Sequence, residues 1–121
     1  MNEHAHDPQH IQITEALIHV YLLLTQYLDH IVDERNSPEL SNQDIETQLE
    51  KARTTLQTFL AANPVVQAKV GKESDRILSE ATQVRKEGQS TKNMEKLTSE
   101  RNLLQTKIVT LTDLVAVFRA I

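Results

Sequence analysis

The stretch ALIHVYLLL, residues 16–24, limits the possible folds of this chain more than any other feature. Eight of its nine residues are apolar, and only His19 interrupts the run. A helix of this composition is apolar almost all round, so other parts of the protein have to cover it. The run is also much shorter than the ~20 apolar residues that a membrane-spanning helix needs. We therefore expect it to form the centre of a helical core.

The composition favours helix throughout the chain. The 121 residues include two Gly, three Pro and no Cys, and 39% of them are hydrophobic. Leu, Glu, Gln, Lys and Ala are common, and these residues have high helix propensity. Apolar and polar residues do not alternate over more than a few positions, so no strand is predicted. This length suits one domain with a modest core.

Apolar residues recur at spacings of three and four in four segments, which are separated by Pro- or Gly-containing breaks. We predict an all-α fold, an antiparallel bundle of four helices over about 8–35, 42–62, 64–87 and 92–120. Gly71 lies inside the third segment, where glycine costs about 1 kcal/mol, so a break in that helix is an open alternative. Residues 1–7 are expected to be a disordered tail, and 8–121 a single helical-bundle domain.

The first and last helices carry more apolar surface than the two narrow helices between them can easily cover. Two arrangements are consistent with this pattern. One is a four-helix bundle packed within one chain, and the other is an extended helical hairpin that completes its core by forming a homodimer. The sequence leaves both open.

Charge is distributed unevenly along the chain. Residues 1–50 carry a net charge of −9 and residues 51–121 carry +5, for −4 in total. The two halves are therefore expected to pack against each other, within a chain or across a dimer. Binding of nucleic acid by the basic half is an alternative, which we consider weaker because acidic residues are interspersed and no aromatic residue lies among the bases. Arg101 interrupts the apolar seam of the last helix, and either extends to the bundle edge or pairs with an acid of the first half.

The chain lacks the residue patterns of common catalytic and metal sites. Without Cys it has no disulfide, thiol nucleophile or Cys-based zinc site, and it contains no phosphate-binding glycine loop or HExxH motif. His4, His6 and His10 are interspersed with Glu3 and Asp7 and form a conceivable metal-binding group. We favour a polar tail, because a specific site needs ligands held in place. We thus expect no enzyme activity, no cofactor and no metal.

These observations favour a non-catalytic helical protein–protein interaction module, such as an adaptor, chaperone or assembly subunit, located in the cytoplasm and not in a membrane. Its apolar first and last helices would dock another protein or a second copy of the chain. The candidate partner-binding residues are the apolar positions in the second half of the last helix: Leu104, Ile108, Leu111, Leu114, Val115, Val117, Phe118 and Ile121.

The order of elements resembles that of the small helical chaperones of flagellar and type III export, the FlgN type. A long first helix is followed by an acidic connection, a Lys-containing second helix and a long last helix with ERNLLQTKIVTLTDLVAVF. The resemblance implies that the last helix holds an export substrate. Its binding face would then be formed by Leu104, Ile108, Leu111, Val115 and Phe118.

Overall fold

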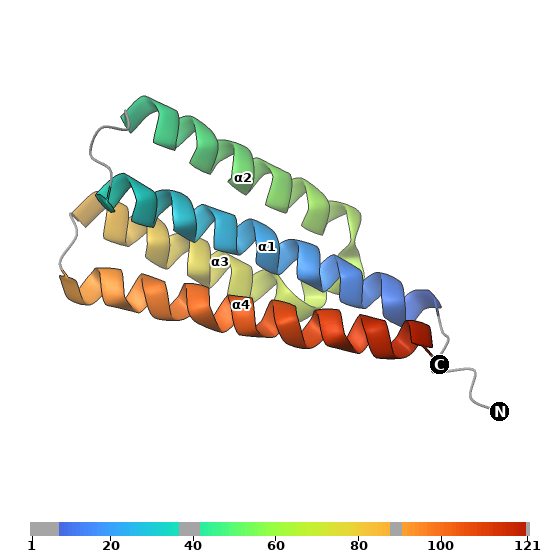
Figure 1. Cartoon of the computed structure of the whole chain (residues 1–121). Coiled ribbons are helices and arrows are strands. Elements are labelled where there is room, and N and C mark those ends of the chain that lie inside the picture. The colour runs from blue at the N-terminus through green and yellow to red at the C-terminus, as the bar shows by residue number, and fades with distance from the viewer. Residues whose placement is uncertain (1–7, 37–41, 88–90, 121) are drawn as a thin grey trace.

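The structure is a computed structural model that describes residues 8–36, 42–87 and 91–120. These residues form four helices and no strand: α1 (Pro8–Asn36), α2 (Asn42–Ala62), α3 (Pro64–Glu87) and α4 (Thr91–Ala120). They assemble as a four-helix bundle in which consecutive helices run in opposite directions (Figure 1). The predicted fold class is confirmed, and each predicted helix boundary lies within one residue of the observed one. The predicted tail, residues 1–7, lies outside the described residues.

The boundary between α2 and α3 shows how local sequence sets the helix ends. Asn63 is the single residue between the two helices, and its side-chain Nδ2 donates a 2.8 Å hydrogen bond to the Phe59 carbonyl at the end of α2. Its own carbonyl accepts the first helical bond of α3, from the Gln67 amide at 2.9 Å. Pro64 then occupies the first helical position, where a missing N–H costs nothing. Asn63 therefore serves both helix ends.

α3 continues through Gly71 without a break. Gly71 is buried, and a Cβ built there would meet only the Cγ atom of Gln67, at 3.3 Å. No close backbone approach requires a glycine at this position. The possible break is therefore absent, because packing of the flanking Val70, Ser74 and Ile77 outweighs the low helix propensity of a single glycine.

α1 is the central element of the bundle. It packs most extensively against α4, and also against α2 and α3, whereas α3 and α4 approach each other less closely. The core is one cluster to which all four helices contribute, with Leu24, Leu28 and Ile31 of α1 almost fully enclosed. The run ALIHVYLLL thus forms the middle of the bundle, as expected. Leu22 is the exception, since its side chain is 50% exposed on the outer side of α1.

Part of the charge asymmetry is compensated by ion pairs within the chain. Three ion pairs join an acid of the first half to an arginine of the second, at nitrogen–oxygen distances of 3.0 to 3.3 Å: Asp29–Arg101, Glu15–Arg119 and Glu46–Arg85. Arg101 therefore pairs with an acid of the first half, the second of the two alternatives. The two halves therefore pack against each other within one chain and form ion pairs across that contact.

Candidate partner-binding surface

The candidate residues of α4 fall into two stripes with different surroundings. The inner stripe packs toward the bundle: Leu104 is 1% exposed, and Ile108 and Leu111 are partly buried against the core. Val115 and Phe118, further along the same side, are also partly buried. Leu104 is therefore fully occupied within the chain and has no surface to offer a partner, because the apolar side chains of α1 already cover it.

The outer stripe of α4 remains open to solvent. Leu114 is 40% exposed and Val117 is 52% exposed, and Leu103 on the same side is 51% exposed. Ile121, the last member of this stripe, lies outside the described residues. The stripe also contains Lys107, which is four residues from Leu103 and seven from Leu114. Because residues at these spacings share a helix face, Lys107 shows which neighbour the stripe faces.

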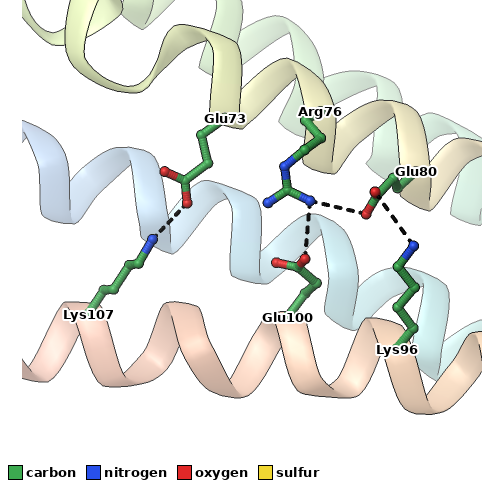
Figure 2. A network of polar contacts seen from close by, with 6 residues as sticks. All are labelled: Glu73, Arg76, Glu80, Lys96, Glu100 and Lys107. Carbon is green, nitrogen blue, oxygen red and sulfur yellow. Dashed lines mark hydrogen bonds and ion pairs between the residues drawn. The ribbon is translucent and has the colours of Figure 1, made fainter.

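Lys107 places this face toward α3. Its Nζ lies 2.7 Å from Glu73 Oε1, and Arg76 Nη1 lies 3.2 Å from Glu100 Oε1 (Figure 2). Because α3 and α4 run antiparallel, moving back along α3 from Glu73 corresponds to moving forward along α4 from Lys107. Pro64, nine residues before Glu73, therefore lies level with about Ala116, nine residues beyond Lys107. α3 begins at Pro64. The last turn of α4 therefore extends past the start of α3, and Val117 is 52% exposed there.

α1 continues alongside α4 to the end of the bundle. The His10 and Phe118 rings lie 6.2 Å apart, and Arg119 Nη2 lies 3.0 Å from Glu15 Oε1. In Figure 1, α1 and α4 extend together beyond the connection between α2 and α3, so that this end of the molecule is only two helices thick. We call this end of the bundle, formed by residues 8–16 of α1 and 112–120 of α4, the open end.

A hollow of about 200 Å³ lies where the α2–α3 connection meets α1. Ile13 and Ala16 of α1 line one side, and Ala62, Pro64 and Val65 line the other. Val65 is 55% exposed beside it. The open end therefore combines apolar side chains from α4, α1 and the start of α3. Sequence spacing alone did not identify Val65 as part of this surface, since its position beside α1 depends on where the α2–α3 connection lies in space.

The side of α4 that faces α3 is joined to it mainly by charged side chains. Besides the Glu73–Lys107 and Arg76–Glu100 pairs, Glu80 accepts contacts from Arg76 at 3.2 Å and from Lys96 at 3.6 Å (Figure 2). The hydrogen bond and negative charge of Glu73 raise the pKa of Lys107, and Glu100 similarly raises the pKa of Arg76. These long side chains bridge α3 and α4, which approach each other less closely than α1 and α4 do.

The histidines form no metal site in the described part of the chain, where no group of three potential ligands converges. The exposed His19 ring lies edge-on to Phe59 of α2, with centroids 4.7 Å apart. His10 contacts the Phe118 ring. Both rings therefore pack against aromatic side chains of neighbouring helices. His4 and His6 lie outside the described residues. No helix among the described segments is long and apolar enough to cross a membrane.

Comparisons with protein-family models, with curated proteins and with solved structures found no significant match to this chain. Its function must therefore be argued from its own surfaces.

Proposed function

We propose that this protein is a non-catalytic interaction module whose open end binds an apolar helix face of a protein partner. The observation that supports the proposal is the exposure of Leu114 and Val117, at 40% and 52%, on a side of α4 that its neighbours leave uncovered near the end of the bundle. Exposed apolar residues that lie together at one end of a molecule are typical of protein–protein contact sites. A helix laid along α4 would continue the packing that α3 provides further along the bundle.

The free energy of binding that the exposed apolar side chains of this surface can contribute is modest. Fully burying a Val or Leu side chain contributes about 1.5–3 kcal/mol, so covering the exposed half of Leu114, Val117 and Val65 contributes about 3 kcal/mol in total. Stable complexes bury on the order of 1,200–2,000 Å² of total surface, which requires additional contacts around these residues. The exposed Glu15–Arg119 pair at the same end offers charges for the rim of such an interface. The proposal covers two kinds of partner, a second copy of the chain and another protein, and an export chaperone would be one form of this activity.

The open end can be tested with a photo-crosslinking amino acid at Val117 and, as a matched control, at Val109. Both are exposed valines of α4, at 52% and 60%, but Val109 points away from the outer stripe. We expect specific adducts at position 117 in the cells of origin and few at position 109. In purified protein, Val117→Glu should weaken the contact at least tenfold and Val109→Glu should not. Equal crosslinking at both positions, together with unchanged binding by Val117→Glu, would refute the proposal.

Removing the end of α4 would be a less discriminating test. A chain that ends before Leu111 loses Leu111, Val115 and Phe118, whose partly buried side chains lie on the inner side of α4. Its altered association would then reflect a damaged core as well as a missing surface. Point substitutions in the outer stripe avoid this ambiguity, because Leu114 and Val117 are the exposed members.

A further inference from the structure

A second surface lies near the opposite end of the bundle, in a groove between α2 and α3. Its volume is about 870 Å³, and its lining along α2 extends from Gln43 to Thr55. Twelve residues of helix span about 18 Å, so the groove is elongated. Leu49 and Tyr27, which are 7% and 4% exposed, lie at its floor. A groove of this length suits a segment of polypeptide better than a compact small molecule.

Arg53 stands out among the arginines whose side chains the structure describes. The other four each contact a carboxylate: Arg76, Arg85, Arg101 and Arg119. Arg53 instead donates from Nη2 to the hydroxyl of Thr82, at 3.0 Å. An arginine carries five N–H donors in a planar fork that fits a carboxylate or phosphate in bidentate geometry. Its remaining donors are therefore available at the groove lining.

Thr82 holds this arginine in place. Its hydroxyl donates a 2.8 Å hydrogen bond to the Leu78 carbonyl, which uses its single hydrogen. The contact of 2.8 Å between Tyr27 Oη and Thr82 Oγ1 must then have the tyrosine as donor. With Arg53 donating as well, Thr82 uses its one hydrogen and both lone pairs. The hydrogen bond from Nη2 to Thr82 thus holds the Arg53 guanidinium at the groove, while its other N–H donors face no carboxylate among the described residues.

The remaining charges of the groove are predominantly basic. Lys51, Arg53, Arg85 and Lys86 contribute four positive charges, and Glu46 and Glu50 contribute two negative ones, so the lining carries a net charge of +2. Arg85 pairs with Glu46, at 3.3 Å. Lys51 and Lys86 form no ion pair with any described residue. The uncompensated charge lies in a chain whose net charge is −4, so it is a local feature of this groove.

We propose that the α2–α3 groove binds an acidic segment of a partner polypeptide, with one carboxylate held by the unpaired donors of Arg53. Apolar residues of the segment would lie over Leu49 and Tyr27, and further acidic residues would approach Lys51 and Lys86. Nucleic acid fits less well, because Glu46 and Glu50 would repel a continuous line of phosphates and the one aromatic ring of the lining is buried. This site is separate from the open end and does not depend on it.

Titration of the full chain with a blocked (Glu-Leu)4 peptide, followed by amide and arginine side-chain NMR shifts, tests the proposal. We expect shifts at Arg53 and Thr82, with binding that weakens as salt is added. Arg53→Gln should weaken binding at least tenfold, and Arg53→Lys should weaken it less. Lys72→Gln removes an exposed cation of α3 outside the groove and should change affinity less than twofold. Inorganic phosphate and a (Lys-Leu)4 peptide are the probes for unspecific anion and peptide binding.

A second variant keeps the test decisive if Arg53→Gln perturbs folding. Lys51→Gln combined with Lys86→Gln changes only exposed side chains and should weaken the peptide several-fold. Shifts confined to the open end, unchanged affinity in both sets of variants, or no binding of (Glu-Leu)4 would overturn the proposal. Tighter binding of a dT8 oligonucleotide through the same residues, or binding of phosphate as tight as that of the peptide, would also overturn it.

Discussion

Replacing Ser74 with alanine should stabilise the bundle. Ser74 lies in the middle of α3 with an exposed fraction of 0%, and its Oγ has no hydrogen-bond partner in the structure. A buried hydroxyl without a partner costs about 1–3 kcal/mol relative to its hydration in the unfolded chain. Alanine removes that penalty and also has a higher helix propensity, by about 0.5 kcal/mol.

The loss of one oxygen atom opposes this gain only slightly. A residual void of ~10 Å³ would cost about 0.2 kcal/mol at the cavity coefficient measured for core substitutions. The expected net increase in the free energy of unfolding is therefore about 1–3 kcal/mol. At this chain length each kcal/mol raises the melting temperature by roughly 3–6 °C.

Urea denaturation followed by far-ultraviolet circular dichroism measures this difference. Ser79→Ala is the matched control, because Ser79 is an exposed serine of the same helix and reports the propensity gain alone. The m-value should stay unchanged in both variants, since neither alters the surface exposed on unfolding. If Ser74→Ala stabilised the protein no more than Ser79→Ala, the unpartnered hydroxyl would not carry the assigned penalty and the reasoning would be refuted.

Three further substitutions test the core and its charges. Gly71→Ala should raise the free energy of unfolding, measured by thermal denaturation, by about 0.5–1 kcal/mol, because alanine has the higher helix propensity and its Cβ meets only the flexible Gln67 side chain. Destabilisation would show that the Gln67 side chain cannot move away from the new Cβ. Burial and then Glu73 raise the pKa of Tyr21 above its ordinary 10.0, while Lys107 lowers it. The folded state thus keeps the phenol proton longer than the unfolded state, so stability should fall as pH rises above about 10, and Lys107→Met should delay tyrosinate absorbance further. Arg101→Met should change stability by less than about 1 kcal/mol in urea, because its pair with Asp29 is about one-third exposed; a larger loss would mean that the pair fixes the packing of α1 on α4.

Two substitutions at separate sites distinguish whether the protein binds partners through its open end, through the α2–α3 groove or through both. Val117→Glu affects the projecting turns of α4, and Arg53→Gln affects the opposite region of the bundle. Neither substitution replaces a residue of the hydrophobic core cluster, so each should leave the helical content measured by circular dichroism unchanged. Loss of one binding activity with retention of the other would separate the two surfaces.

The sequence alone determined the four helices and their ends. Capping residues, prolines and the spacing of apolar positions act within a few residues of each boundary, so they can be identified without knowing the fold. Asn63 and Pro64 illustrate this, since the connection they predict is the one observed. The inner stripe of α4 was also predictable, because its heptad spacing requires an apolar neighbour.

Tertiary structure decided which apolar residues remain exposed and which charges remain unpaired. Leu104 and Val117 belong to the same predicted surface, yet the first is 1% exposed and the second 52%, because Leu104 lies on the side of α4 that packs into the core and Val117 on a side that its neighbours leave open. The choice of Thr82 as the partner of Arg53, and the enclosure of Ser74, likewise depend on the relative placement of helices. Local pattern determines which face of a helix is apolar, but the offset between helices far apart in sequence determines how much of that face is covered.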